Sequence, residues 1–330
     1  MDASRPVFKR LDHVVARAED PRRLFSLLTE TLGLPVAWPL APYPAFDSGG
    51  VALGNLYVEV MRCGPARGPG RASRPARLSA VVFEAPGIER AAEELSRRRI
   101  PHTPPVPYME RGEDGARTRI WSNVVLGRMF GRDLLVDATI LMSRLPGAAS
   151  MSDAGAGRRL DRWQLDLLMR RSLVFLCEYH YENFGRRPFW SEFGSHDAKR
   201  AADRERLSAC GGGALGVESA AEVSAGVRDF GAARELWRRL YAPAAETAEG
   251  LWESDGAPAL RLVRAAADSI QTLFLKVSSL ARAETFLRES GMLGASTENE
   301  IQIAPARLEG LDVRLVARER RRGSHRRRGP

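Results

Sequence analysis

The fold is decided by two neighbouring stretches, RLDHVVARAEDPRRLFSLLTETLGLPVAW (10–38) and FDSGGVALGNLYVEVMR (46–62), with a Pro-rich turn between them. The apolar and β-branched residues at the start of the first stretch predict a strand. Asp20 then provides an N-cap for a helix that has Pro21 at its first position and Gly33 at its end. Two or three strands follow, so the expected order is βαβββ.

A single βαβββ unit cannot cover both faces of its own small sheet, so related copies are expected elsewhere in the chain. RLSAVV (77–82) matches RLDHVV (10–15) at four of six positions and also leads into a predicted helix. Weaker copies of this strand–helix opening start at 222 and at 272, and the last one predicts a helix over 280–293. Four openings in one chain predict four βαβββ modules.

These motifs resemble the vicinal oxygen chelate superfamily, also called the glyoxalase, bleomycin-resistance and extradiol-dioxygenase superfamily. The resemblance rests on Leu-Asp-His-Val-Val (11–15), Asp20, Leu-Gly-Leu-Pro (32–35) and Gly-Asn-Leu-Tyr-Val-Glu-Val (54–60). It implies an α+β fold in which βαβββ modules pair and each pair curls into a cup around a site. Four modules then form two glyoxalase-like domains.

The domain boundaries follow from the modules and from the polar or Gly-rich segments between them. The second module carries an insertion before its final strand, either a lid over the cup or a decoration. The expected units are an N-terminal domain at 1–182 with modules at 10–63 and 77–182, a linker at 183–212, a C-terminal domain at 213–317 and a disordered Arg-rich tail at 318–330.

Composition restricts the class of partner. The formal charge of +9 is concentrated in the tail, and aromatic residues are not interleaved with the basic ones, so no nucleic-acid partner is expected. No signal peptide or membrane span is predicted, because no apolar stretch approaches the ~20 residues that a bilayer requires. The three cysteines form no CxxC pair, which favours free thiols in the cytoplasm. A small molecule is the expected partner.

The resemblance places metal ligands on the first and last strands of each module. In module one these are His13 and Glu59, and in module two Glu178, whereas Ala80 stands where a second histidine would be. One imidazole and two carboxylates suit a divalent metal such as Fe(II), Mn(II), Zn(II) or Ni(II). Period-2 alternation puts His180 on the same face as Glu178, as a candidate catalytic base or substitute ligand.

Two functional hypotheses stay open. One is a metal-dependent glyoxalase-like enzyme with isomerase, lyase or epimerase chemistry on a small oxygenated substrate. The other is a metal-free protein that sequesters a small molecule, in which His13 and Glu59 only form hydrogen bonds. Ala80 counts against an extradiol dioxygenase, because the two-His-one-Glu ligand set that the resemblance implies is not reproduced.

The remaining candidates have simpler interpretations. His102 and His196 lie near Pro or Gly and are expected at the surface. The C-terminal domain has Glu222 and Thr272 at the positions of His13, and is therefore expected to be degenerate, with a structural or dimer-mimicking role. Because four modules are present in one chain, no cup requires dimerisation for its completion.

Overall fold

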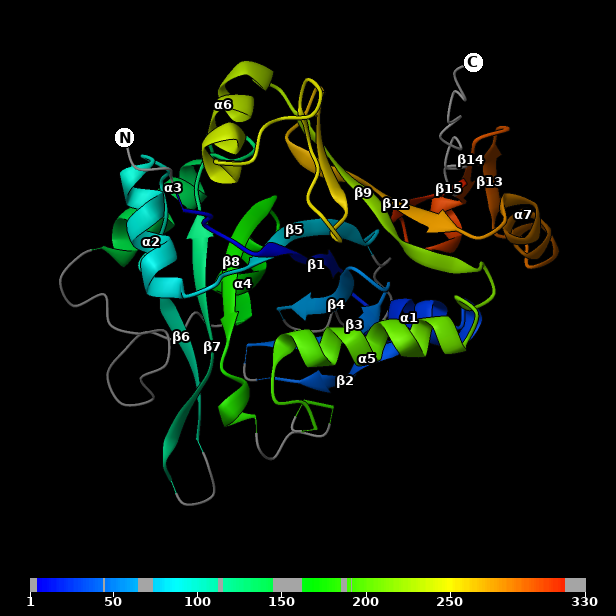
Figure 1. Cartoon of the computed structure of the whole chain (residues 1–330), viewed down its shortest axis with the longest axis horizontal. Helices are drawn as coiled ribbons and strands as arrows, with labels where there is room; N and C mark the ends of the chain where they lie inside the picture. The colour runs from blue at the N-terminus through cyan, green and yellow to red at the C-terminus, as the bar shows by residue number, and fades with distance from the viewer. Residues whose placement is uncertain are drawn as a thin grey trace, which may run out of the picture.

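The computed structural model describes residues 5–43, 45–64, 74–111, 115–144, 162–184, 189–190 and 192–317. Within these residues the chain forms two curled mixed sheets, one from each half of the sequence (Figure 1). The predicted α+β fold with two glyoxalase-like domains is confirmed. The predicted tail at 318–330 lies outside the described residues, as do residues 145–161 of the predicted insertion.

The N-terminal sheet contains two consecutive βαβββ modules. The first consists of β1 (Arg10–Arg17), α1 (Pro21–Ser26) with its π-helical continuation (Leu27–Thr31), β2 (Val36–Pro42), β3 (Phe46–Ala52) and β4 (Tyr57–Cys63). The second consists of β5 (Arg77–Glu84), α2 (Ile88–Arg97), β6 (Val106–Arg111), β7 (Arg117–Leu126), α3 (Leu134–Ser143), α4 (Arg162–Leu168) and β8 (Leu173–Tyr179). The strand order is β2-β3-β4-β1-β5-β8-β7-β6.

The pairing of these strands makes the two modules equivalent. β1 and β5 run antiparallel at the centre of the sheet, and each is parallel to the last strand of its own module, β4 or β8. The predicted start of the first helix is also present. The Asp20 carboxylate accepts a hydrogen bond from the Arg23 N–H at 3.1 Å, and Gly33 has a φ of +68° after the helical segment.

The C-terminal sheet repeats this arrangement with one strand fewer among the described residues. Its elements are β9 (Val217–Val227), α6 (Phe230–Tyr241), β10 (Leu251–Trp252) and β11 (Ala259–Arg264), then β12 (Ser269–Val277), α7 (Leu280–Glu289), β13 (Leu293–Ser296), β14 (Glu300–Ile303) and β15 (Asp312–Ala317). The helix predicted over 280–293 was too long. It ends at Glu289 because Gly291 adopts a φ of +64°, and β13 follows.

The two halves share one hydrophobic core. Alternate residues of both sheets, such as Val14, Val58 and Leu273, face the helices and belong to a single cluster of buried side chains. The Trp237 indole N–H, on α6, donates a hydrogen bond of 2.7 Å to the Met129 carbonyl in the N-terminal half. The opposite faces of the sheets are therefore the ones that line the two cups.

The span predicted as a linker contains a helix, α5 (His196–Ala209), preceded by a short 3-10 turn (Tyr181–Asn183). The Ser195 hydroxyl caps α5 by accepting a hydrogen bond from the Ala198 N–H at 3.2 Å. The helix runs alongside the strands of module one (Figure 1) and packs against β3 and β9. Among the described residues, no helix is both long enough and apolar enough to cross a membrane.

Candidate functional site

The candidate site begins at an irregularity in β1. The pairing of β1 with β5 shifts register between Leu11 and His13, and this bulge lets both Asp12 and His13 avoid the helix-covered core to which Leu11 and Val14 belong. Asp12 is completely buried, and His13 is nearly so. From the sequence only His13 is predicted to face the cup, because strict alternation along the strand would put Asp12 on the other face.

Asp12 accepts hydrogen bonds from four side chains. Its Oδ1 lies 2.6 Å from both the His196 Nε2 and the Arg200 Nη1, and its Oδ2 lies 2.9 Å from the His13 Nδ1 and 2.8 Å from the Tyr179 hydroxyl. Burial alone would raise the pKa of Asp12, but the two histidines and Arg200 outweigh burial and hold it well below its usual value. A buried carboxylate therefore joins β1, β8 and α5.

The His13 imidazole lies between two carboxylates. Its Nδ1 contacts Asp12, and its Nε2 lies 3.3 Å from the Glu59 Oε2. Burial disfavours the charged ring, but these two acids outweigh burial and raise the pKa of His13 to about 9. In the absence of a metal, His13 is therefore an imidazolium at neutral pH.

Glu59 is oriented from its other side. The Ser48 hydroxyl donates a hydrogen bond of 2.6 Å to the Glu59 Oε1, and the Trp38 indole N–H donates one of 3.2 Å to the Ser48 hydroxyl oxygen. Trp38, Ser48 and Glu59 lie on β2, β3 and β4, three adjacent strands. The predicted pair of His13 and Glu59 is thus brought together inside the cup.

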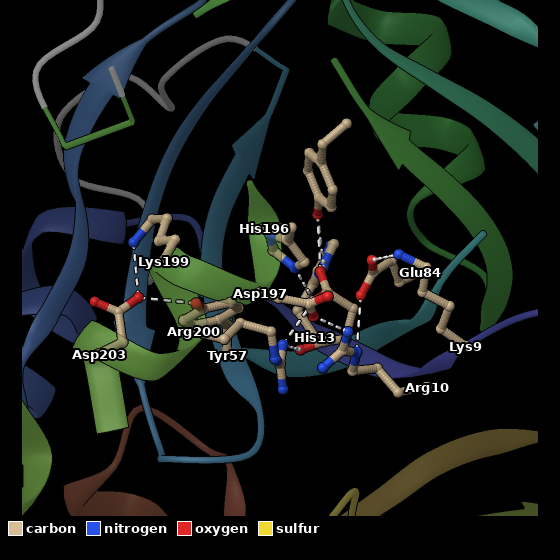
Figure 2. Close-up of polar contacts among 12 residues, drawn as sticks. Lys9, Arg10, His13, Tyr57, Glu84, His196, Asp197, Lys199, Arg200 and Asp203 are labelled. Carbon is tan, nitrogen blue, oxygen red and sulfur yellow. Dashed lines mark hydrogen bonds and ion pairs between the residues drawn. The ribbon is translucent and has the colours of Figure 1, made fainter. Parts of the chain in front are cut away.

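Helix α5 supplies further polar groups to this cup (Figure 2). The Lys199 ammonium donates hydrogen bonds to the Asp203 carboxylate at 2.7 Å and to the Ala37 carbonyl at 2.8 Å, and Tyr57 donates to the same carboxylate at 2.8 Å. His196, also on α5, has its Nδ1 2.8 Å from the Tyr181 hydroxyl. Asn183, at the start of the same span, donates a hydrogen bond of 2.7 Å to the Arg119 carbonyl on β7. The span predicted as a linker is thus hydrogen-bonded to strands of both N-terminal modules.

The structure does not bring Glu178 into the cup. Its carboxylate accepts a hydrogen bond of 3.3 Å from the Ile88 N–H at the start of α2, on the helix-covered face, and its side chain is 24% exposed. On β8 the cup is faced by Phe175, Cys177 and Tyr179. The prediction that Glu178 faces the cup was therefore wrong. Because β8 is covered on both sides, both of its faces are apolar, and the alternation of residues cannot show which face lines the cup.

His180 follows Glu178 onto the same face. Its Nε2 lies 3.4 Å from the Ser122 hydroxyl and 3.8 Å from the Glu178 carboxylate, and its Nδ1 lies 3.4 Å from Glu182. These polar partners lie away from the pair of His13 and Glu59, so the geometry does not place His180 as a base beside that pair.

The strand register identifies the module-two positions that correspond to His13 and Glu59. His13 is paired with Tyr57, two residues before Glu59, and Ala80 is paired with Leu173, two residues before Phe175. Ala80 and Phe175 therefore occupy the equivalent positions, and neither has a side chain that can bind a metal. The polar half of the cup comes from module one, and the apolar half from module two.

Sequence reasoning missed several residues of this site. His196 belongs to this site and is buried, not at the surface as expected. His102 is also buried, but it lies outside the site, with its Nδ1 2.8 Å from the Ile100 carbonyl. His196 became part of the site because α5 carries it to Asp12, which is 184 residues away in the chain. Local sequence signals cannot report such a contact. Asp12 was the one missed residue that the sequence could have indicated, because it stands next to His13 and a carboxylate often orients a metal-binding imidazole.

A second group of donor atoms lies next to the first. Asp12, Glu84 and His196 are all buried and offer ligand atoms that lie within 4.8 Å of one another. Glu84 is already paired, however, with the Lys9 ammonium at 2.9 Å and with the Arg10 guanidinium at 2.8 Å (Figure 2). These two cations balance the charge of Glu84, although its buried Oε2 accepts no hydrogen bond from the residues that the structure describes. Because Glu84 already has two cationic partners, this group is a weaker candidate for a metal ion than the pair of His13 and Glu59.

No protein-family profile and no curated protein sequence matches this chain. Among solved structures, it is similar to the 2,3-dioxygenase LapB from Pseudomonas sp. KL28, with a TM-score of 0.54 and 9% identity over 94% of this chain and 92% of that one. The chain has the vicinal oxygen chelate fold. A hypothetical protein from Staphylococcus aureus is also similar, with a TM-score of 0.50 and 9% identity over 93% of this chain and 99% of that one.

This fold similarity confirms the predicted resemblance at the level of architecture. Both similar chains are matched over nearly their whole length, so the likeness includes both halves of this protein. At such low identity the comparison concerns the fold alone, and the chemistry must be argued from the side chains in the cup.

Proposed function

We propose that the N-terminal cup binds a divalent metal through His13 and Glu59 and acts on a small oxygenated substrate by isomerase, lyase or epimerase chemistry. The observation that carries this proposal is the orientation of His13. Its Nδ1 is held by the Asp12 carboxylate, while its Nε2 points to a carboxylate oxygen of Glu59. A carboxylate behind the imidazole is the usual arrangement around a metal-binding histidine.

The spacing of the two donor atoms fits a shared metal. Ligand bonds of about 2.1 Å at tetrahedral or octahedral angles separate two donors by roughly 3.0–3.4 Å. The His13 Nε2 and the Glu59 Oε2 are 3.3 Å apart. One nitrogen and one hard oxygen suit Fe(II), Mn(II), Zn(II) or Ni(II), and the metal would have to displace the proton of His13.

The residues around this pair have separate tasks. A bound metal supplies Lewis acidity toward a carbonyl or enolate oxygen. Asp12 fixes the tautomer and the direction of the His13 ring, and Ser48 holds Glu59 in place. Burial and the charge of Asp12 raise the pKa of Tyr179 well above its usual value, so its phenol stays protonated and can donate a hydrogen bond but cannot act as a base.

The test is the metal content of the purified, untagged protein, measured by elemental analysis after incubation with each of the four metals. We expect near-stoichiometric metal that is lost in His13→Ala and in Glu59→Ala. Glu178→Ala is the matched control, because its carboxylate lies on the opposite face of the sheet, and it should keep the metal. A protein that takes up none of the four metals, or a His13→Ala variant that keeps its metal, would refute the proposal.

One observation favours a metal-free binding protein as the second candidate. Ala80 and Phe175 leave module two without ligands, and His13 is already neutralised by two carboxylates. In that case the cup would bind a small molecule on its apolar half, formed by Ala80, Val82 and Phe175, with His13 and Glu59 as hydrogen-bonding groups. We do not extend the 2,3-dioxygenase activity of LapB to this chain, since Ala80 stands where the resemblance requires a histidine.

A further inference from the structure

The C-terminal cup is built on the same register as the N-terminal one, which allows a comparison position by position. β9 and β12 are antiparallel at its centre, β9 is parallel to β11, and β12 is parallel to β15. Glu222 is paired with Ala259, two residues before Arg261, just as His13 is paired with Tyr57, two residues before Glu59. Glu222 therefore corresponds to His13.

The other three positions follow in the same way. Arg261 corresponds to Glu59. In the last module, Thr272 is paired with Asp312, two residues before Arg314, so Thr272 corresponds to Ala80 and Arg314 to Phe175. The four positions that would converge on a metal in this fold thus hold one acid, one hydroxyl and two arginines. Two guanidinium groups stand where carboxylate or apolar side chains stand in the N-terminal cup.

Both arginines are oriented by acids. The Arg261 Nε lies 2.8 Å from the Glu222 Oε1, and its two Nη groups make no hydrogen bond to any residue that the structure describes. The Arg314 Nη1 donates a hydrogen bond of 2.7 Å to Glu300, and its Nε donates one of 3.2 Å to Asp312. Arg261 is therefore held through its Nε alone and Arg314 through its Nε and Nη1, so both Nη groups of Arg261 and the Nη2 of Arg314 remain for another partner.

The lining is polar, and its two arginines are accessible. The side chains of Arg261 and Arg314 are 39% and 35% exposed, whereas His13 and Glu59 are almost covered in the N-terminal cup. Thr272 donates a hydrogen bond of 2.7 Å to Asp312, on the same face. Phe274 lies two residues beyond Thr272 on that face and adds an apolar surface.

We propose that the C-terminal cup is a second small-molecule site, which binds a hydroxylated oxyanion through Arg261 and Arg314. Guanidinium groups match the planar geometry of carboxylate and phosphate oxygens. Glu222 accepts a hydrogen bond from a hydroxyl group of the same ligand, because an anion without a hydroxyl would leave Glu222 facing a like charge. The expected ligand class is a hydroxycarboxylate or a hydroxyalkyl phosphate. The C-terminal domain is then not degenerate but has a different specificity.

The test is isothermal titration calorimetry of the full chain at low ionic strength, with citrate as the hydroxycarboxylate and glycerol 3-phosphate as the phosphate. Saturable binding of either one, at one molecule per chain, is expected, and the better ligand identifies the type of oxyanion. Arg261→Gln and Arg314→Gln should each weaken binding by about tenfold or more, the usual effect of losing a charge-assisted contact.

Two control variants distinguish this site from general attraction of anions to a basic surface. Arg264→Gln removes a cation from the opposite face of β11, where Arg264 is 74% exposed and stacks on Phe230, and it should bind as the natural chain does. His13→Ala should also bind normally, so the result does not depend on the metal proposal. Circular dichroism checks that each variant is folded. If Arg314→Gln is unfolded, Arg314→Lys takes its place, because lysine keeps the positive charge but lacks the planar pair of N–H donors of the guanidinium. Absence of saturation with both ligands, or an equal loss in Arg264→Gln, overturns the proposal.

Discussion

Replacement of Asp12 by Asn is the sharpest test of how the N-terminal cup is held together. The substitution keeps the size of the side chain but removes its charge, while four donors on three elements still point at it. An amide offers one acceptor oxygen and turns an NH₂ group toward the remaining donors. The Arg200 guanidinium, whose side chain is only 2% exposed, loses its charged partner.

The magnitude follows from this burial. Removal of one partner from a buried charge pair costs about 3–5 kcal/mol, because the other charge stays buried without compensation. Asp197→Asn is the matched control, since Asp197 lies on the same helix and pairs with Arg10 but has a 62% exposed side chain. Exposed pairs contribute about 1 kcal/mol or less.

The assay is urea unfolding of Asp12→Asn, Asp197→Asn and the natural chain, monitored by circular dichroism. We expect Asp12→Asn to lower the free energy of unfolding by several times the loss seen in Asp197→Asn. NMR of the His13 ring should also show a lower pKa in Asp12→Asn, because one of its two acids is gone. Equal stability of the two variants would show that Asp12 does not join α5 to the cup.

Two further predictions concern pH and packing. In chelator-treated protein the pKa of His13 is about 9 in the folded state and 6.5 in the unfolded state. Protonated His13 therefore stabilises the fold by on the order of 3 kcal/mol below pH 6.5, and this stabilisation is lost as the pH rises through 9. The difference in unfolding free energy between the natural chain and His13→Gln should shrink over that range, and a constant difference would contradict the raised pKa. Gly50→Ala should cost about 1–3 kcal/mol in urea unfolding, because its Cβ would lie 2.3 Å from the Trp38 ring. Gly194→Ala, which meets no atom within 4 Å, should change stability by less than about 0.5 kcal/mol.

The strand–helix openings determined most of the architecture from sequence. The Asp20 cap, the Gly33 stop and the repeat of RLDHVV as RLSAVV are local patterns, and local patterns fix where elements begin and end. The pair of His13 and Glu59 could be named because the resemblance places ligands on the first and last strands of a module. Each lies on a short strand whose place in the module is set by its immediate neighbours.

The tertiary structure alone decided the rest of the site. β8 is covered on both faces, so its sequence could not show that Tyr179 faces the cup and Glu178 faces α2. The bulge at Asp12 depends on the pairing of β1 with β5, which no single module contains. The docking of α5, which brings His196 and Arg200 to that carboxylate, joins residues 184 and 188 positions apart. Charge pairing over such distances follows from how the whole chain packs, and no window of sequence contains it.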